Sequence, residues 1–354
     1  MKRKAVVAMS GGVDSSVAAA LMKQDGYDVT GVMLKLWTGA AANNESGCCS
    51  LDAAEDARRV SQILDIPFYV LNFAEQFNAT VVANFTSRYA AGLTPNPCIE
   101  CNRSVKFATL LRKARSFGAD VLATGHYARV DETTGTFQLR RGVDQSKDQS
   151  YVLYMLGQDE LAAARFPVGH YSKTDIRAVA SELGFRNALK KDSQEICFVP
   201  GGDTHRFISE HVPEGSVPGP ILDAEGTRVG THRGFAHYTI GQRRGTGVAA
   251  KVPVYVKHIS PVENTIVVAT RQQLWEQEFE VEGLNFVSGP DSQAFRAAVM
   301  TRYRGPESDA TISVEGDRAK VVFDQPQPPT APGQAAVFYE GDRVLGGGTI
   351  RRAA

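Results

Sequence analysis

The 354 residues of this chain exceed what one hydrophobic core usually holds, so we expect two or three domains. Its 39 Lys and Arg residues are balanced by 39 Asp and Glu residues, so the net charge neither requires nor excludes a nucleic-acid partner. No apolar run approaches the length that spans a bilayer, and five cysteines do not make a disulfide scaffold at this length; we expect a cytoplasmic protein whose thiols do chemistry or bind metal.

The first expected element is a strand over Lys4–Met9, followed by a glycine-rich turn and a helix over Val17–Gln24. The apolar part of this segment is too short for a signal peptide and meets Asp14. A strand-to-helix turn directs backbone N–H groups and a helix N-terminus at one point, which makes a site for phosphate. The lysine of the mononucleotide P-loop is absent.

The sequence of this turn is Ser10-Gly11-Gly12-Val13-Asp14-Ser15. It looks like the pyrophosphate loop of enzymes that split ATP into AMP and pyrophosphate. Asp14 is suited to holding Mg²⁺ on the pyrophosphate. The alternative is an ordinary glycine turn in which Asp14, Ser15 or Ser16 caps the helix.

Short apolar runs then alternate with helical patterns as far as about residue 130. The expected strands are Asp28–Trp37, Pro67–Asn72 and Asp120–Thr124, and the expected helices are Leu51–Leu64, Ala74–Ala91 and Phe107–Phe117. This alternation predicts a parallel sheet with helices on both faces. Ligands bind at the carboxyl ends of such strands, where Gly125 permits close approach of the backbone. We assign no chemical role to His126.

After a helix expected over Thr174–Leu183, the pattern changes near Pro200 to short β-branched runs separated by turns. Hairpin turns are expected at Asp223–Gly226, Val262–Asn264 and Glu340–Asp342. We therefore expect an α/β domain over residues 1–206 and two small β domains over 207–275 and 276–354. The proline-rich segment Gln325–Pro332 is expected to be an extended surface connection within the last domain.

Two segments carry cysteines of chemical interest. The first, from Thr94 to Cys101, is a proline-rich turn expected to lead into a helix from about Lys106; a thiol there should have a lowered pKa, because Lys106 and Arg103 are close in sequence. A C-x-x-C pair alone is compatible with a redox motif, half of a metal site or coincidence. The second segment contains Cys197, which taken alone would be a buried, inert cysteine.

Taken together, these segments resemble the tRNA-specific 2-thiouridylase family, which installs sulfur at C2 of the wobble uridine in certain tRNAs. The resemblance covers nearly the whole chain, in family order. It rests on Ser10-Gly-Gly-Val-Asp-Ser15, Thr94-Pro-Asn-Pro97, Cys101-Asn102, Thr124-Gly-His-Tyr127, Lys147-Asp-Gln-Ser-Tyr151, Ser193-Gln-Glu-Ile-Cys-Phe198, Tyr238-Thr-Ile-Gly-Gln-Arg-Arg-Gly245 and Arg302-Tyr-Arg304.

The resemblance implies a pyrophosphate-loop adenine-nucleotide-binding fold, a doubly wound parallel sheet, followed by two small β domains of which the last is barrel-like. It implies a tRNA-uridine 2-sulfurtransferase that uses ATP and Mg²⁺, adenylates O2 of uridine and replaces it with sulfur, giving AMP and pyrophosphate. The residues implied to bind ATP are Ala8, Met9, Ser10, Gly11, Gly12, Val13, Asp14, Ser15, Leu34 and Gly125.

In the same resemblance, Cys197 would receive a persulfide sulfur from a donor protein, and Cys101 would free that sulfur and leave a Cys101–Cys197 disulfide. The partner would be tRNA, whose target base would be turned out of its stack. The residues implied to border this base are Asn96, Pro97 and Cys98, and those implied to contact tRNA are Lys147, Asp148, Gln149, Arg302 and Tyr303. The β domains would bind RNA, with Gln242, Arg243 and Arg244 either contacting phosphates or forming ordinary surface.

One position departs from the family pattern: Cys98 stands where many members carry an acidic residue. An iron–sulfur cluster on Cys98, Cys101 and Cys197 is therefore an alternative to persulfide chemistry. Cys48 and Cys49 are expected to be a loop feature without an assigned role. Two other functions stay open: a pyrophosphate-loop synthetase that transfers ammonia, which needs no paired cysteines, and an RNA-binding protein with a vestigial nucleotide loop.

Overall fold

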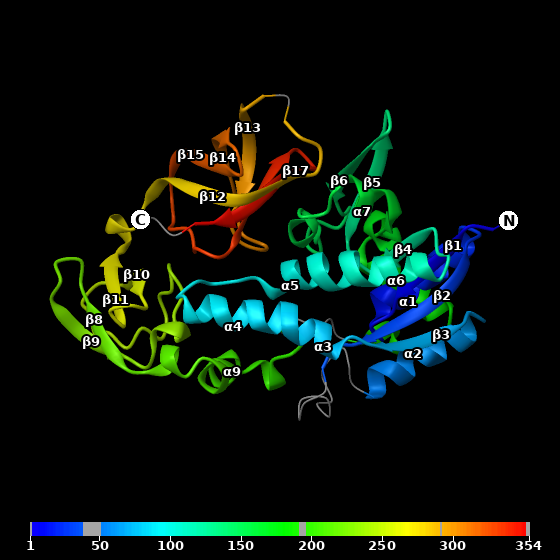
Figure 1. The fold of residues 1–354 in the computed structure, drawn as a ribbon, viewed down its shortest axis with the longest axis horizontal. Helices are drawn as coiled ribbons and strands as arrows, with labels where there is room; N and C mark the ends of the chain where they lie inside the picture. The colour runs from blue at the N-terminus through cyan, green and yellow to red at the C-terminus, as the bar shows by residue number, and fades with distance from the viewer. Residues whose placement is uncertain (1, 38–50, 191–195, 291, 352–354) are drawn as a thin grey trace. The chain divides into compact units, whose positions relative to one another are not determined.

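The computed structural model describes residues 2–37, 51–190, 196–290 and 292–351, which form two compact units (Figure 1). The first unit comprises the described residues up to Val81, Cys98–Gly202 and Asp342–Leu345. The second comprises Val82–Pro97, Asp203–Gly341 and the described residues from Gly346 onward. Within these described residues, no helix combines the length and apolarity needed to cross a membrane.

The first unit is built on a parallel five-stranded sheet with the order β3-β2-β1-β4-β7. Its strands are β1 (Lys4–Ala8), β2 (Asp28–Lys35), β3 (Phe68–Asn72), β4 (Val121–Thr124) and β7 (Ala164–Arg165). The predicted parallel sheet is confirmed, and the four strands expected from sequence end within two residues of the observed ones. Continuous apolar runs were sufficient to locate these strands, because parallel strands are buried on both faces of the sheet.

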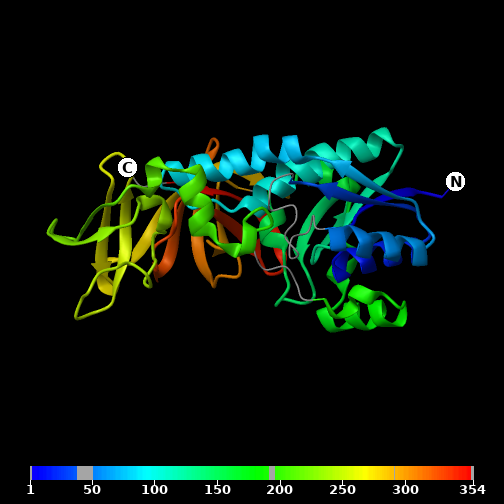
Figure 2. The same cartoon turned by 90° about the horizontal axis from the view of Figure 1, so that it is seen from below.

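Both faces of this sheet are covered. Ala5 and Val7 of β1 and Val121 of β4 lie in one core with residues of α1 (Val13–Gln24), α2 (Leu51–Ile63) and α8 (Lys173–Glu182). The alternate residues Val6 and Leu122 are also buried, so the opposite face is covered too. Figures 1 and 2 show α2 alongside β2 and β3.

The other helices between residues 74 and 202 belong wholly or largely to the first unit, apart from α4 (Ala83–Ala90), which belongs to the second. They are α3 (Ala74–Phe77), η2 (Asn78–Val82), α4 (Ala83–Ala90), α5 (Pro97–Glu100), η3 (Cys101–Leu110), α6 (Leu111–Ser116), η4 (Ser150–Leu153), α7 (Gln158–Ala163), η5 (Pro167–His170), η6 (Arg186–Leu189) and η7 (Pro200–Gly202). Two helix starts were predicted too late. The helix α1 begins at Val13 rather than Val17, and the run α5–η3–α6 begins at Pro97 rather than near residue 106, because proline is favoured in the first helical turn.

A hairpin that the sequence patterns missed, β5 (Ala128–Thr133) and β6 (Thr136–Arg141), completes the first unit. The carboxylate of Asp342 accepts hydrogen bonds from Arg129 and Arg140, each at 2.6 Å, and Arg343 pairs with Arg140. Asp342 and Arg343, which are distant in sequence, therefore bind to this hairpin.

The second unit contains a four-stranded sheet, β10-β11-β8-β9, and a closed six-stranded barrel, β12-β15-β14-β13-β16-β17. The strands are β8 (Gly219–Leu222), β9 (Arg228–His232), β10 (Val254–Ser260), β11 (Thr265–Thr270), β12 (Glu276–Phe286), β13 (Ala294–Met300), β14 (Glu307–Glu315), β15 (Arg318–Gln327), β16 (Ala335–Glu340) and β17 (Arg343–Ile350). Its short helices are α9 (Thr204–His211), η8 (Glu214–Ser216), η9 (Phe235–His237) and η10 (Arg271–Gln273).

The three predicted hairpin turns join β8 to β9, β10 to β11 and β16 to β17, as expected. The segment Gln325–Pro332 was expected to be an extended surface connection, and this prediction is correct only in part. Its first residues, as far as Gln327, belong to β15, and Thr330 is buried.

Candidate active site

The glycine-rich loop joins β1 to α1 at the carboxyl edge of the sheet. Gly11 has a φ of +74°, and a Cβ there would lie 2.2 Å from the carbonyl oxygen of Ala53, so only glycine fits. Gly12 is the N-cap of α1, and no side chain caps the helix. The hydroxyl of Ser15 instead accepts from the N–H of Ser10 at 3.1 Å and donates to the carbonyl of Gly12. The alternative in which Asp14, Ser15 or Ser16 caps the helix is therefore wrong.

Asn187, in η6, supports this loop. Its side chain is 4% exposed, and Nδ2 donates to the carbonyl of Gly11 and the hydroxyl of Ser16, both at 3.0 Å. Because these bonds fix the loop where the helix begins, Asn187 is a positioning residue. Nothing in the sequence pattern pointed to it.

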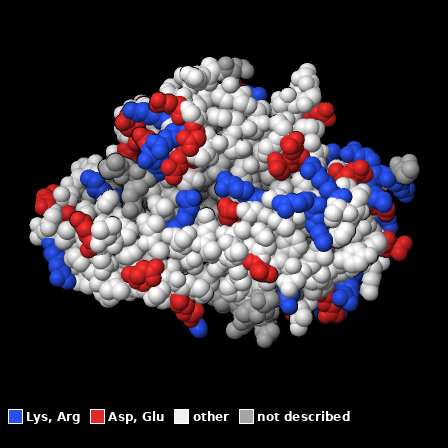
Figure 3. Space-filling model, viewed as in Figure 1, with Lys and Arg blue, Asp and Glu red and all other residues white. Residues whose placement is uncertain are grey.

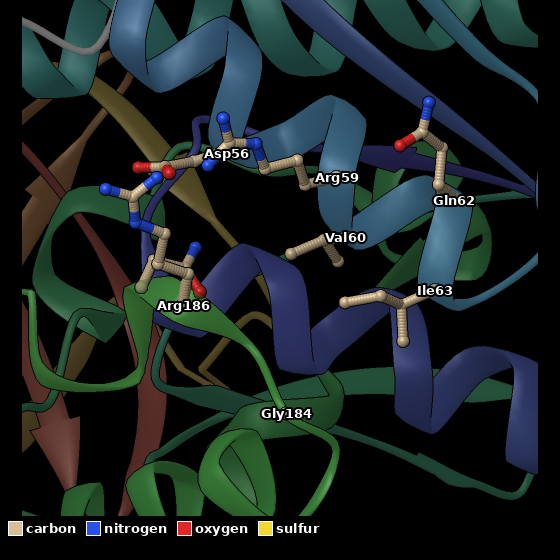
Figure 4. A pocket seen from close by; sticks show the side chains of 8 residues that line it. Asp56, Arg59, Val60, Gln62, Ile63, Gly184 and Arg186 are labelled. Carbon is tan, nitrogen blue, oxygen red and sulfur yellow. The ribbon is translucent and has the colours of Figure 1, made fainter.

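Asn187 also lines a cavity of about 300 Å³ in the first unit (Figure 4). In this view Asp56, Arg59 and Arg186 gather at one end, and Ile63 lies at the other. Asp56 forms an ion pair with Lys190 at 2.8 Å. The mixed charges at the polar end give this cavity no preference for an anion.

Asp14 faces a lysine that is distant in sequence. Lys173, the first residue of α8, is 8% exposed and donates from Nζ to both carboxylate oxygens of Asp14, at 2.7 and 2.8 Å. The hydroxyl of Tyr127 donates to the same carboxylate at 2.6 Å. This arrangement places a cation beside the loop although the P-loop lysine is missing from it.

The backbone around Lys173 is fixed from both sides. The Ser172 hydroxyl accepts from the N–H of Asp175, which forms a capping box at the start of α8. The N–H of Lys173 donates to the carboxylate of Asp144 at 3.0 Å. Hydrogen bonds from Ser146 and from the Lys173 backbone lower the pKa of Asp144, so it stays ionised.

These groups fit a pyrophosphate. The uncapped N-terminus of α1 offers backbone N–H groups, and Lys173 offers a charge. For Mg²⁺ the loop offers the carboxylate of Asp14, although nowhere in the described ranges do three His, Cys, Asp or Glu side chains come close enough to hold a metal ion by themselves. One carboxylate is sufficient for Mg²⁺ that arrives with phosphates, which supply further ligands.

Gly125 and Leu34 lie by the carboxyl ends of β4 and β2, on the same side of the sheet as the loop. Gly125 follows β4, and a Cβ on it would be 2.7 Å from the backbone nitrogen of Ser15, so it packs directly on the start of α1. Leu34 lies near the carboxyl end of β2, half-buried. The predicted ATP-binding residues of the loop, with Gly125, are therefore brought together at one sheet edge.

His126 is buried beside this edge and has a structural role. Its Nδ1 lies 2.7 Å from the Thr124 hydroxyl and its Nε2 lies 3.3 Å from Nζ of Lys106. Desolvation, with Lys106 adding to it, holds the pKa of His126 well below 6.5. A neutral ring can accept from the lysine through Nε2, which leaves the proton on Nδ1.

Cys98 and Cys101 lie in one helical run rather than in a turn before it. Cys101 is buried at the start of the π-helical stretch η3, where the neighbouring Asn102 donates to the carbonyl of Val152 at 2.8 Å. Cys98 is exposed, yet desolvation of its thiol raises its pKa more than Lys106 lowers it. The expectation of a lowered thiol pKa is therefore wrong for Cys98.

Cys197 is exposed, so the alternative of a buried, inert cysteine is wrong. The next residue, Phe198, anchors it: the ring is buried and packs on Phe77, 5.6 Å between centroids, and on Trp37, 6.4 Å away. No disulfide joins the described cysteines. Cys48 and Cys49, and residues 193–195 of the Cys197 motif, lie outside the described residues.

The loop carrying the predicted tRNA contacts Lys147, Asp148 and Gln149 is folded around Asp148. This carboxylate is buried and accepts from the backbone of Gly142 and from the hydroxyl of Ser150. Gln149 exchanges two hydrogen bonds with the backbone of Tyr127, at 2.8 and 3.0 Å. Asp148 and Gln149 thus shape the loop, and Lys147 is half-buried beside them.

The remaining predicted tRNA contacts lie in the second unit or at its edge. Arg302 is exposed and Tyr303 half-buried; the guanidinium of Arg304 lies 5.1 Å from the Tyr303 ring centroid. Arg243 and Arg244 are exposed, but Gln242 is engaged at both ends of its amide, by the N–H of Thr239 and the carbonyl of Arg244. Asn96 and Pro97 are half-buried where α5 begins.

A basic surface is visible in the first unit despite the neutral net charge. Lys and Arg side chains gather over the region that Figure 1 labels α6 (Figure 3). The exposed basic residues of this helix are Arg112, Lys113 and Arg115. Such a patch is the local feature that a nucleic-acid partner requires.

Comparison with known proteins gives matches along the chain. Residues 3–201 match the family model "tRNA methyl transferase HUP domain", residues 205–270 the "tRNA methyl transferase PRC-barrel domain" and residues 276–350 the "Aminomethyltransferase beta-barrel domain". The tRNA-specific 2-thiouridylase MnmA of Roseiflexus castenholzii is 47% identical and that of Moorella thermoacetica 48%, each over 99% of both chains. A solved 4-thiouridine synthetase in complex with RNA and ATP is 18% identical, over 60% of this chain and 51% of that one, with a TM-score of 0.37, a likeness too weak to carry an argument.

Proposed function

Because this chain belongs to the tRNA-specific 2-thiouridylase family, we propose that it uses ATP to replace the C2 oxygen of a tRNA uridine with sulfur. The observation that carries the proposal is the loop of Gly11 and Gly12 with Asp14 and Lys173 beside it. O2 of uridine is a poor leaving group, and ATP supplies the adenylyl group that turns it into a good one. The products of this activation are AMP and pyrophosphate.

The chain's own residues provide the setting for that step. Backbone N–H groups at the start of α1 and Nζ of Lys173 bind the phosphate charge, because both present positive charge at one point. Asn187 holds the loop so that its backbone donors need not reorganise. Asp14 would hold the Mg²⁺ that accompanies the phosphates, after Lys173 had turned from its carboxylate towards them.

The sulfur step is assigned to Cys197 and Cys101. Cys197, exposed, accepts the outer sulfur of a persulfide from a donor protein. The Cys101 thiolate attacks the inner sulfur, a Cys101–Cys197 disulfide forms, and hydrosulfide leaves to attack C2 of the activated uridine. An external dithiol supplies the two electrons that reduce the disulfide for the next cycle.

We assign these steps to residues 1–206, and tRNA binding to the β domains over 207–275 and 276–354. Asn96, Pro97 and Cys98 border the target base, while Lys147, Arg302 and Tyr303 contact the RNA. Asp148 and Gln149 act by holding the loop of Lys147, because their polar atoms are engaged within it. Arg243 and Arg244 are exposed to contact phosphates.

Product analysis tests the proposal. The protein is incubated with unmodified tRNA, ATP and sulfide, and in a parallel reaction with ammonia in place of sulfide. Formation of AMP, pyrophosphate and thiolated uridine, with no reaction of ammonia, supports the assignment. Incorporation of nitrogen, or ATP consumption that does not depend on tRNA, would favour a different pyrophosphate-loop enzyme.

A further inference from the structure

A second cavity, of about 530 Å³, lies within the second unit, and neither the glycine-rich loop nor a cysteine is among its lining residues. Its volume is in the range of about 300–1,000 Å³ that is typical of small-molecule sites. Residues that line it include Gln242, Tyr255, Arg271, Trp275, Arg302 and Pro329. Two arginines and no acidic residue are among its described lining residues, so it attracts an anion.

Trp275 supplies an aromatic surface to this cavity. The residue is 43% exposed, which is unusual for a side chain that gains so much from burial. The guanidinium of Arg271 lies 5.7 Å from its ring centroid, so a cation is held at the same place. In sites for single-stranded RNA, an exposed aromatic ring stacks on a base and a neighbouring arginine contacts a phosphate. Trp275 and Arg271 are such a pair.

Arg302 is held at the cavity by the turn that follows it. A Cβ on Gly305 would lie 2.5 Å from Cγ of Arg302, so glycine is needed for the arginine side chain to pack there. Arg304 adopts a φ of +57°, which a non-glycine residue rarely does. The turn that follows Arg302 at the cavity therefore contains a backbone conformation that costs free energy.

The carboxylate nearest in sequence is bound to a residue of the cavity wall, Thr330. Glu276 follows Trp275, yet its Oε2 accepts from the backbone N–H and the hydroxyl of Thr330, both at 3.3 Å. It does not line the cavity. The two arginines, and not Glu276, are therefore the charged residues that line the cavity.

We propose that this cavity binds one unpaired nucleotide of the RNA substrate, with the base stacked on Trp275 and a phosphate at Arg271 and Arg302. The proposal rests on the proposed function for its choice of ligand. Stacking of one base is worth about 1–3 kcal/mol, or about 5- to 150-fold in Kd, which strengthens binding of a large RNA but holds a free nucleotide only weakly. The RNA is therefore favoured over a free nucleotide as the source.

Fluorescence can report on this site because the chain has two tryptophans. A Trp37→Phe variant leaves Trp275 as the single indole, and its emission is followed while substrate tRNA, or free UMP or AMP, is added. We expect tRNA to quench the emission at the concentrations at which it binds, and free nucleotides to quench only at far higher concentrations. Quenching by UMP or AMP at the same concentrations as tRNA would overturn the RNA assignment.

Affinity measurements provide a second test of the proposed site. In the full chain, Trp275→Ala should raise the Kd for tRNA about 5- to 150-fold, while Trp275→Phe retains most of the affinity because a ring remains to stack. Arg302→Ala should weaken binding and lower its salt dependence. The matched controls are Val262→Ala, an exposed apolar residue (97%) in the same unit, and Arg318→Ala, an exposed arginine of the barrel.

The outcomes separate this site from the proposed activity. Unchanged tRNA affinity in Trp275→Ala, or equal losses in Trp275→Ala and Val262→Ala, would overturn the site whatever the protein catalyses. Tight, Trp275-dependent binding of tRNA without thiolation by the unaltered protein would leave the site standing and refute the proposed activity.

Discussion

Lys173 donates hydrogen bonds from Nζ to both carboxylate oxygens of Asp14, at 2.7 and 2.8 Å, across 159 positions of the sequence. The lysine side chain is 10% exposed and the aspartate side chain 28%, so the pair is only partly screened by water. Because Lys173 lies beside the uncapped start of α1, we propose that it takes the place of the lysine that P-loop proteins carry within the loop itself.

Replacing this lysine should therefore impair adenylation. Lys173→Met removes a charge that stabilises the leaving pyrophosphate, and we expect kcat for ATP consumption to fall by about 10²- to 10³-fold, as when one transition-state donor is removed. Lys173→Arg should be partly active. The matched control is Lys190→Ala, which breaks a 2.8 Å pair with Asp56 whose lysine is more exposed than Lys173. A Lys173→Met enzyme as active as this control would remove Lys173 from the mechanism.

Removing the other partner should separate stability from activity. Asp14→Ala should abolish formation of AMP and pyrophosphate, and it should also lower the free energy of unfolding, because Lys173 is left nearly buried without its counter-ion. The double variant Asp14→Ala, Lys173→Met should regain stability in urea unfolding but no activity. Equal stability of the single and double variants would show that leaving Lys173 without its counter-ion does not destabilise the native protein.

The buried His126 predicts a specific loss of stability in acid. The pKa of His126 is lowered in the native state. Below about pH 6.5 the unfolded chain therefore binds a proton at His126 that the native protein does not bind. The free energy of unfolding should then fall with decreasing pH, by at most about 1.4 kcal/mol per pH unit for this one group. Desolvation lowers the pKa of His237 to about 4, so it adds to the same slope. Urea unfolding at several values of pH should show a smaller slope for His126→Asn, and an unchanged slope would refute the assignment.

A Cys98→Asp variant and an iron assay distinguish persulfide chemistry from a metal cluster. In the persulfide scheme Cys98→Asp should retain most thiolation, since it restores the residue common in the family. A cluster on Cys98, Cys101 and Cys197 would lose a ligand and its iron. Protein purified without oxygen is assayed for iron and acid-labile sulfide beside the activity of the variant. Stoichiometric iron in the unaltered protein, with an inactive Cys98→Asp variant, would establish the cluster instead.

The sequence predicted the parts of the fold that depend on local pattern. Buried parallel strands are short apolar runs, so β1 and β4 were located within two residues. The helix starts at Val13 and Pro97 were missed, because glycine and proline normally interrupt helices and here stand at their beginnings.

The partners of the site residues could not be predicted in the same way. Lys173 and Asn187 reach the loop only because α8 and η6 pack beside α1, and no spacing within the sequence encodes that contact. The burial of Asp148 was missed for a related reason: a charged residue is expected at the surface unless its hydrogen bonds are known.

The most direct test of the account is analysis of the nucleosides in tRNA from a strain that lacks this protein, with and without the protein restored. We predict that 2-thiouridine derivatives are absent from the deletion strain, return with the unaltered chain, and do not return with Asp14→Ala or Cys101→Ser. Unchanged 2-thiouridine in the deletion strain, or full restoration by Cys101→Ser, would contradict it.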